Sequence, residues 1–225
     1  MNVVLTREVG QNDELRSWVG DHAAVIEVPL TTTHYRDLDV VRREMRALPR
    51  FGIFRALVVT SARSGDFAPA ALAALAADAA VLSVGPATTK ALADAGVSVT
   101  GEGAGRAVDL ASLIDEGPVL VIGAAQMRDE LSDALAARGV EVVRVACYET
   151  LAVSLSDADV GALRRADVVL IGAPSAWRVA QPHVGPSTWI VVPGATTADA
   201  VRRDHGRVIE QWGAGLGDAL SSLPR

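Results

Sequence analysis

Aromatic residues, cysteines and clustered positive charges are all scarce in this chain of 225 residues. Aromatic residues make up only 4%, although 50% of the residues are hydrophobic. The core must therefore consist mostly of Ala, Val and Leu, a composition typical of helices packed on parallel sheets. A single cysteine, Cys147, excludes an internal disulfide bond and a metal site built from several cysteines. The histidines are scattered and have no metal-ligand spacing.

The net charge is −6 and no run of Lys or Arg occurs, which argues against nucleic acid or an anionic membrane as partner. No stretch reaches the ~18 apolar residues of a membrane span, and the N-terminus lacks the apolar segment of a signal peptide. We therefore expect a cytoplasmic protein. The glycine-rich residues 101–105 follow a weak strand and lack the lysine of a phosphate loop, and no dinucleotide, Walker or GxSxG motif is present.

Residues 81–96, VLSVGPATTKALADAG, predict a buried strand, a tight turn and a helix that stops at Gly96. Pro86 suits the first helical turn, because its missing N–H would have no intrahelical partner there. Gly85 lets the backbone approach a ligand closely, and the free N–H groups of the helix start attract anions. Residues 189–206 repeat this arrangement with GATTA in place of GPATT, which indicates two related halves.

Strands alternate with helices of about 8–14 residues along the chain, a pattern typical of a doubly wound parallel α/β sheet. Before the 81–96 stretch we expect a helix at residues 68–77. After it we expect a short strand at residues 97–100 and a helix at residues 106–116.

The order of these units predicts two similar domains, one inserted into the other. We expect a discontinuous α/β domain made of residues 1–31 and 152–225, and an inserted α/β domain made of residues 37–146. Residues 32–36 and 147–151 would form a two-stranded linker. A double crossing of extended segments suits a hinge, so we expect the ligand to bind between the two domains.

Six loops rich in Gly, Ala, Ser and Thr follow the carboxyl ends of predicted strands, where open parallel sheets bind ligands. They are residues 6–7, 60–64, 85–89, 123–126, 172–175 and 194–197. Their many backbone N–H and hydroxyl donors suit a large ligand with several carboxylates. Each Ser or Thr could instead be a helix N-cap, which stabilises a helix by ~1 kcal/mol without any ligand. Arg7 and Tyr148 lie beside these loops, where contact with the ligand and simple exposure or packing are both open.

The chain resembles the uroporphyrinogen-III synthase family over nearly its whole length. The resemblance rests on motifs in a common order: VLTR at 4–7, Thr60-Ser61, VGPAT at 84–88, VACYET at 145–150, Pro174-Ser175 and GATTA at 194–198. It implies two α/β domains joined by a two-stranded linker. Such enzymes need no cofactor and cyclise linear hydroxymethylbilane to uroporphyrinogen III in haem biosynthesis, with loss of water and inversion of ring D. Their substrate carries eight carboxylates, which agrees with the chemistry of the loops.

The resemblance also implies roles for particular residues. Tyr148 matches the tyrosine proposed to assist departure of the hydroxyl, so it is the expected catalytic residue. The expected substrate-binding residues are Arg7, Ser61, Gly85, Thr88, Ser175, Gly194, Thr196 and Thr197. We expect no metal ligand and no cofactor, and a monomer that acts on a small molecule.

Four residues depart from the family's pattern. Glu8 and Ala195 stand where the family has proline, and Gly172 and Ala173 replace a T/F-S pair. These changes remove a hydroxyl and add a negative charge near the expected site. They favour an alternative, a catalytically impaired, two-lobed module that binds a small molecule. A nucleotide- or sugar-phosphate-using enzyme is disfavoured, because the phosphate loop and the acidic ribose partner are absent.

Overall fold

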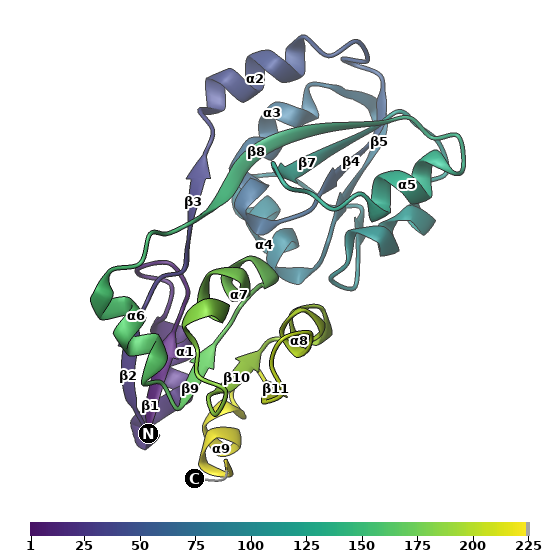
Figure 1. Ribbon diagram of the computed structural model, residues 1–225. Coiled ribbons are helices and arrows are strands. Elements are labelled where there is room, and N and C mark those ends of the chain that lie inside the picture. The colour runs from purple at the N-terminus through teal and green to yellow at the C-terminus, as the bar shows by residue number, and fades with distance from the viewer. Residues whose placement is uncertain (224–225) are drawn as a thin grey trace. The chain divides into compact units, whose positions relative to one another are not determined.

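A computed structural model describes residues 1–223, and strands and helices alternate along them in an α/β fold (Figure 1). The chain divides into two compact units. Unit 1 contains residues 1–32 and the chain from Leu151 onward, and unit 2 contains Thr33–Thr150. Within residues 1–223, no helix has the length and apolar character needed to cross a bilayer.

Unit 1 contains a five-stranded sheet with the order β11-β10-β9-β1-β2, in which all pairs are parallel (Figure 1). Its strands are β1 (Asn2–Leu5), β2 (Ala24–Glu27), β9 (Val168–Leu170), β10 (Trp189–Val192) and β11 (Val208–Glu210). Its helices are α1 (Asp13–Val19), α6 (Asp157–Arg164), α7 (Pro174–Ala180), α8 (Ala195–Arg202) and α9 (Leu216–Ser221), with short 3₁₀ helices at Gly20–His22 and Gln181–His183.

Both faces of the unit 1 sheet are buried. Val4 belongs to the core under α6, α7 and α8, whereas its neighbours Val3 and Leu5 belong to the core under α1 and α9. Successive side chains of a strand point to opposite faces, so a strand covered on both faces must be apolar throughout. This burial explains why short continuous apolar runs, rather than alternating ones, marked the strands in the sequence.

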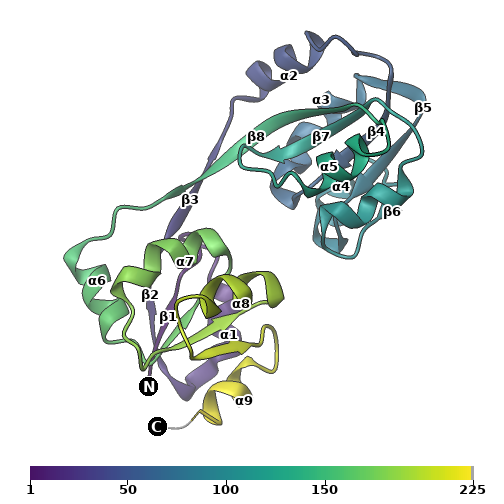
Figure 2. The same cartoon turned by 45° about the vertical axis from the view of Figure 1, so that its right-hand side comes forward.

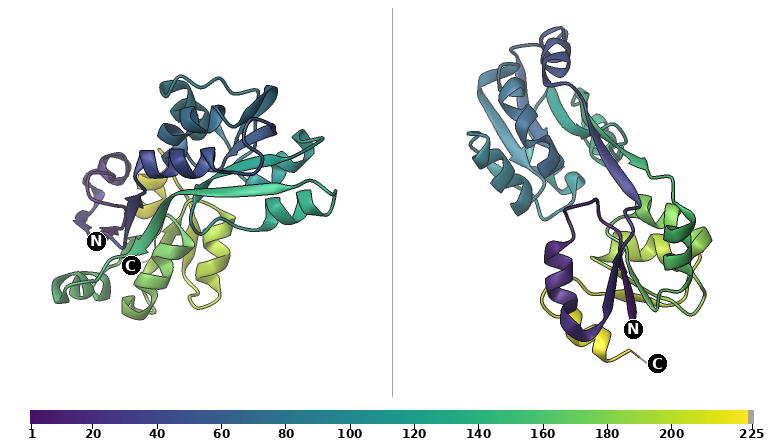
Figure 3. Two further views of the ribbon diagram at one scale, coloured as in Figure 1. Left: turned by 90° about the horizontal axis from the view of Figure 1, so that it is seen from above. Right: turned by 90° about the vertical axis from the view of Figure 1, so that its left-hand side faces the viewer.

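Unit 2 contains a six-stranded sheet with the order β3-β8-β7-β4-β5-β6, in which the strands from β8 to β6 pair in parallel (Figures 2 and 3). Its strands are β3 (Thr31–Tyr35), β4 (Phe54–Val59), β5 (Leu75–Ser83), β6 (Gly101–Glu102), β7 (Val119–Ala124) and β8 (Val142–Ala152). Its helices are α2 (Leu38–Arg46), α3 (Ala68–Leu72), α4 (Pro86–Asp94) and α5 (Glu130–Ala136), with 3₁₀ helices at Ala62–Phe67 and Ala107–Leu113.

The two sheets have the same strand order when β4, β5, β6, β7 and β8 are aligned with β9, β10, β11, β1 and β2. Each sheet therefore reverses its strand order at one place, between β4 and β7 in unit 2 and between β9 and β1 in unit 1. Such a reversal leaves a crevice at the carboxyl ends of the two strands, because the connections leave them in opposite directions.

Strands β3 and β8 carry the chain between the units. The amide of Arg36 donates to the carbonyl oxygen of Cys147 at 2.9 Å, and the amide of Val153 donates to that of Leu30 at 3.0 Å. Residue numbers rise along one segment as they fall along the other, so the two segments run antiparallel.

The expected helix at residues 68–77 is wrong in its second half. Helix α3 ends at Leu72, and Leu75 already belongs to β5, where it pairs with Phe54 of β4. Local propensity favours a helix in this alanine-rich stretch. Pairing with a buried strand prevails, because it satisfies the backbone groups of the stretch inside the sheet.

The expected strand at residues 97–100 is also wrong. The paired strand is Gly101–Glu102, which follows it directly and lies beside β5. The Val97 amide instead donates to the carbonyl oxygen of Leu92 at 2.8 Å, and the Thr100 hydroxyl donates to that of Val81 at 3.1 Å. These residues thus return the chain from α4 to the sheet. The expected helix at 106–116 is a 3₁₀ helix limited to Ala107–Leu113.

Cys147 lies fully buried in the core of unit 2. Burial raises the pKa of its thiol from 9.0 to about 11. The Ser64 hydroxyl, the Gly123 backbone and the charge of Arg36 favour the thiolate and lower the pKa, but their effect is smaller than that of burial. Between pH 9.0 and about 11 the unfolded chain therefore loses a proton that the folded chain keeps. Stability supplied by the protonated thiol is complete below pH 9.0 and declines above it.

We therefore expect wild-type protein to lose roughly 2 kcal/mol more stability than Cys147→Ala when the pH rises from about 8 to about 10.5. Urea unfolding of both proteins at the two pH values measures this difference. Curves that shift equally in the two proteins would contradict a buried, protonated thiol.

Candidate functional site

A threonine hydroxyl bridges the two strands at each order reversal. In unit 1, Thr6 follows β1 and donates to the carbonyl oxygen of Leu170 in β9 at 2.5 Å. In unit 2, Thr60 follows β4 and donates to that of Ile122 in β7 at 3.1 Å. These bonds tie neighbouring strand ends together, so the loops that follow them start from fixed points at the carboxyl edge of each sheet.

Gly123 in β7 leaves the space that Thr60 occupies. A Cβ at Gly123 would lie 2.1 Å from Thr60 Oγ1 and 2.9 Å from Met127 Sδ. We expect Gly123→Ala to lower the free energy of unfolding by roughly 1–3 kcal/mol, because overpacking displaces the bridging hydroxyl. Gly206→Ala is the control, since its Cβ would meet nothing within 4 Å. Denaturant unfolding compares the two, and equal stabilities would contradict the bridge.

The two glycine turns have the same backbone geometry. Gly85 precedes α4 with φ 167° and ψ 179°, and Gly194 precedes α8 with φ 170° and ψ −179°. The carbonyl oxygen of Gly85 accepts from the amides of Thr88 and Thr89 at 2.9 and 3.0 Å, and that of Gly194 accepts from those of Thr197 and Ala198 at 3.1 Å. Any residue can adopt such extended values, so the backbone conformation does not require glycine here. The absence of a side chain instead leaves the backbone of the turn open to a ligand.

Thr88 and Thr197 occupy equivalent positions in these turns and are only 3% and 4% exposed. The N-cap residues are the glycines, and neither helix has a side-chain cap. The capping interpretation is therefore wrong for both threonines. Within residues 1–223, neither hydroxyl forms a hydrogen bond. Thr89 differs, because its hydroxyl contacts Ser83 Oγ at 2.6 Å and donates to the carboxylate of Glu102.

The first turn of each helix offers backbone donors. Helix α4 begins with Pro86, which has no N–H, whereas α8 begins with Ala195, which has one. N–H groups in a first turn have no intrahelical partner, and the helix dipole adds partial positive charge there. Ala195 in place of proline therefore gives α8 one more donor than α4, and exposed Thr196 adds a hydroxyl beside it.

Tyr148 lies in β8 opposite Ala124, at the carboxyl end of β7. The side chain is 6% exposed, and its ring packs against Tyr35 with a centroid separation of 6.0 Å. The guanidinium carbon of Arg63 lies 5.9 Å from the ring centroid, which brings a positive charge to the ring face. Within the described residues the phenol hydroxyl forms no hydrogen bond, so its proton is available to a ligand.

Arg7 lies just after β1, one of the two strands at which the sheet of unit 1 reverses its order. Its guanidinium carbon lies 5.7 Å from the ring centroid of Trp212, and Nη1 is 3.9 Å from a carboxylate oxygen of Glu14. The Arg7 side chain is 37% exposed, so that ion pair is weak and leaves the cation available to an anionic ligand. Sequence reasoning missed Trp212. Its position two residues after β11, in a loop like the six expected ones, was the signal that could have found it.

The two serines differ. Ser61 accepts a hydrogen bond from the amide of Arg63 at 3.2 Å and so caps the 3₁₀ helix that follows it. Ser175 lies half-buried in the first turn of α7, and its hydroxyl forms no hydrogen bond within residues 1–223. Ala173, one of the departures, is the N-cap of that helix, so no side chain caps it.

The structure thus gathers the expected residues into two sets. The carboxyl edge of unit 1 carries Arg7, Ser175, Gly194, Thr196 and Thr197, and that of unit 2 carries Ser61, Gly85, Thr88 and Tyr148. Two residues beside these sets, Tyr35 and Trp212, were not expected from the sequence, whereas Arg63 belongs to the expected loop at residues 60–64. Among residues 1–223, no group of three or more His, Cys, Asp or Glu is placed to hold a metal ion.

These features define a parallel α/β protein whose sheets present backbone and hydroxyl donors at their carboxyl edges. The chain belongs to the uroporphyrinogen-III synthase family, because the family model described as Uroporphyrinogen-III synthase HemD matches residues 20–210. This match confirms the resemblance inferred from the motifs and assigns the chain to a family of cyclising lyases of tetrapyrrole biosynthesis.

Solved structures of the same family have this fold. A mutant uroporphyrinogen III synthase from the extremely thermophilic bacterium Thermus thermophilus superposes with a TM-score of 0.68 at 19% identity, over 98% of this chain and 96% of that one. Uroporphyrinogen-III synthetase from Helicobacter pylori superposes with a TM-score of 0.63 at 16% identity, over 98% and 97%. No curated protein matches this chain in sequence.

Proposed function

We propose that this protein is a uroporphyrinogen-III synthase that cyclises hydroxymethylbilane with loss of water and inversion of ring D. The observation that carries the proposal is the equivalent pair of glycine turns. Each turn places a helix N-terminus at the carboxyl edge of its sheet, with a buried threonine whose hydroxyl forms no hydrogen bond within residues 1–223. Membership of the family supports the same function.

The turns suit a substrate that carries many carboxylates. Amides at the starts of α4 and α8, together with the hydroxyls of Thr88, Thr196 and Thr197, would hold acetate and propionate groups. Arg7 and Arg63 would add two charge-assisted contacts, each held against an aromatic ring. Binding mainly through neutral donors restrains a flexible tetrapyrrole at many points, which favours the geometry in which ring D can be attacked.

Tyr148 would assist the dehydration. Its phenol donates a proton to the departing hydroxyl, which leaves as water, and the bilane becomes an azafulvene cation. Ring closure with inversion of ring D then consumes that cation. The closing ring loses one proton, which replaces the one that the phenol gave up, so the product is neutral and the phenol is restored. The bilane ionises readily, so the protein's main contribution is to hold its conformation rather than to supply strong acids and bases.

We also propose that residues 1–31 and the chain from residue 152 onward form one doubly wound domain, that residues 37–146 form a second, similar one, and that residues 32–36 and 147–151 are linker strands. The identical strand orders of their sheets support this view. The protein would act as a cytoplasmic monomer without cofactor, metal or nucleic acid. The net charge of −6 favours the absence of nucleic acid.

The test is the isomer of porphyrin that the purified protein forms from hydroxymethylbilane, with no metal or nucleotide added. Unassisted closure proceeds without inversion and yields the type I isomer. We expect the type III isomer to dominate after oxidation of the product. A product that is only type I, formed at the unassisted rate although the protein binds the bilane, would reject the synthase and support the binding module.

A further inference from the structure

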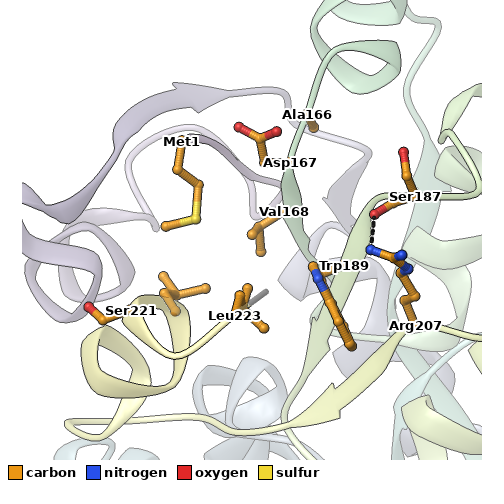
Figure 4. Close-up of a pocket in the computed structure, with 10 residues that line it drawn as sticks. Met1, Ala166, Asp167, Val168, Ser187, Trp189, Arg207, Ser221 and Leu223 are labelled. Carbon is orange, nitrogen blue, oxygen red and sulfur yellow. Dashed lines mark hydrogen bonds between the residues drawn. The ribbon is translucent and has the colours of Figure 1, made fainter. Parts of the chain in front are cut away.

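A cavity lies in unit 1, at the opposite edge of the sheet from the glycine turn. It has a volume of about 690 Å³ and is bordered by the amino ends of β9 and β10, by Arg207 before β11, and by residues of α9 (Figure 4). Cavities of roughly 300–1,000 Å³ suit small molecules. Parallel strands place their amino ends at one edge and their carboxyl ends at the other, so this cavity is separate from Arg7 and Gly194.

The cavity has an apolar wall and an isolated buried donor. Met1, Val168 and Leu223 line it together with the ring of Trp189 (Figure 4). The indole nitrogen of Trp189 is buried and, within residues 1–223, has no hydrogen-bond partner. An unpaired buried N–H costs roughly 1–3 kcal/mol, so an acceptor that reached it would be bound favourably.

A cation stands at the rim of the same cavity. The guanidinium carbon of Arg207 lies 5.2 Å from the ring centroid of Trp189, and Nη1 donates to the carbonyl oxygen of Ser187 at 3.1 Å. Within the described residues Arg207 forms no ion pair with a carboxylate. The carboxylate of Asp167, also in the wall, accepts from the amide of Asn2 at 2.6 Å. The guanidinium therefore keeps donors and a positive charge for a ligand.

We propose that this cavity binds a small aromatic monocarboxylate. The flat body packs on Met1, Val168 and Leu223, while the carboxylate lies at the edge of the Trp189 ring and accepts from Arg207 and from the indole N–H. The apolar wall selects an aromatic body, and the unpaired guanidinium selects a single negative charge. This site is independent of the proposed synthase activity, because none of its residues belongs to the glycine turns.

The experiment uses full-length ¹⁵N-labelled protein and sodium 2-naphthoate as probe. The chain has four tryptophans, and Trp189→Phe identifies the indole signal of Trp189 by its loss. We expect 2-naphthoate to move that signal saturably, with the affinity lowered about tenfold in Arg207→Gln. Arg203→Gln, which removes another exposed arginine of unit 1, is the matched control and leaves the affinity unchanged.

The neutral analogue 2-naphthamide tests the charge without any variant, and we expect it to bind wild-type protein about tenfold more weakly. Thr197→Ala separates this cavity from the carboxyl edge and leaves the shift unchanged. The proposal is overturned if the Trp189 signal does not move saturably at millimolar probe, or if Arg203→Gln weakens binding as much as Arg207→Gln. Loss of the shift in Thr197→Ala would place the probe at the glycine turn and equally overturn it.

Discussion

Tyr148→Phe lowers kcat/KM about tenfold to a hundredfold and leaves the product type III. A general acid contributes roughly 10²–10⁴-fold in favourable cases, and a hydroxyl that departs readily needs less help. The substitution keeps the ring, its contact with Tyr35 and the Arg63 cation above it, so the melting temperature stays unchanged. Steady-state rates with hydroxymethylbilane and separation of the oxidised porphyrins measure both effects.

Tyr35→Phe is the matched control. It removes the same phenol oxygen from the ring that packs against Tyr148, at a residue that is 57% exposed. Its rate should equal that of the wild type. If Tyr148→Phe also retained the wild-type rate, the synthase assignment would stand and Tyr148 would be a packing residue of the unit 2 core.

Thr88→Ala and Thr197→Ala each reduce kcat/KM roughly tenfold to a hundredfold. A hydrogen bond from a hydroxyl to a charged carboxylate is worth about 1.5–3 kcal/mol, and neither hydroxyl has another partner within residues 1–223. Thr197 belongs to unit 1 and Thr88 to unit 2. Steady-state kinetics on each variant, corrected for the folded fraction, measures the loss.

Serine variants isolate the hydroxyl. Thr88→Ser and Thr197→Ser lose the same methyl group as the alanine variants but keep the oxygen, so they should lose stability to a similar extent and retain most of the activity. Thr89→Ala supplies a second comparison, since its hydroxyl is already paired with Ser83 and Glu102. If the alanine and serine variants were equally active, the hydroxyls of Thr88 and Thr197 would not contribute to catalysis, and both residues would only pack in the core.

The structure changes the interpretation of two departures from the family's pattern. Ala195 replaces a proline, and from the sequence this change counted toward an impaired enzyme. In the structure it restores an N–H at the start of α8, where proline would supply none. Ala173 does remove a capping hydroxyl, but α7 forms without it, because Pro174 in its first turn presets the helical backbone. Neither change favours the binding module over the synthase.

Sequence reasoning succeeded where a local signal and the packing agree. The strand, glycine turn and helix of residues 81–96 are present as expected, and α4 stops before Gly96, which has the positive φ of 76° that favours glycine. The failed helix at residues 68–77 shows the opposite case. Its alanines favour a helix locally, while pairing with Phe54, distant in sequence, requires a strand.

By itself the sequence determined the order of strands and helices, the two glycine turns and the family, because each depends on residues adjacent in the chain. The tertiary structure alone decided which donors are free. Thr88 and Thr89 are neighbours with the same side chain, yet only Thr89 is paired, because β6 brings Glu102 beside it. Successive strand residues normally face opposite sides of a sheet. A register shift between β7 and β8 changes this locally, so that the neighbours Cys147 and Tyr148 both belong to the same hydrophobic core. Strand pairing joins residues far apart in the sequence, so no local pattern encodes such contacts.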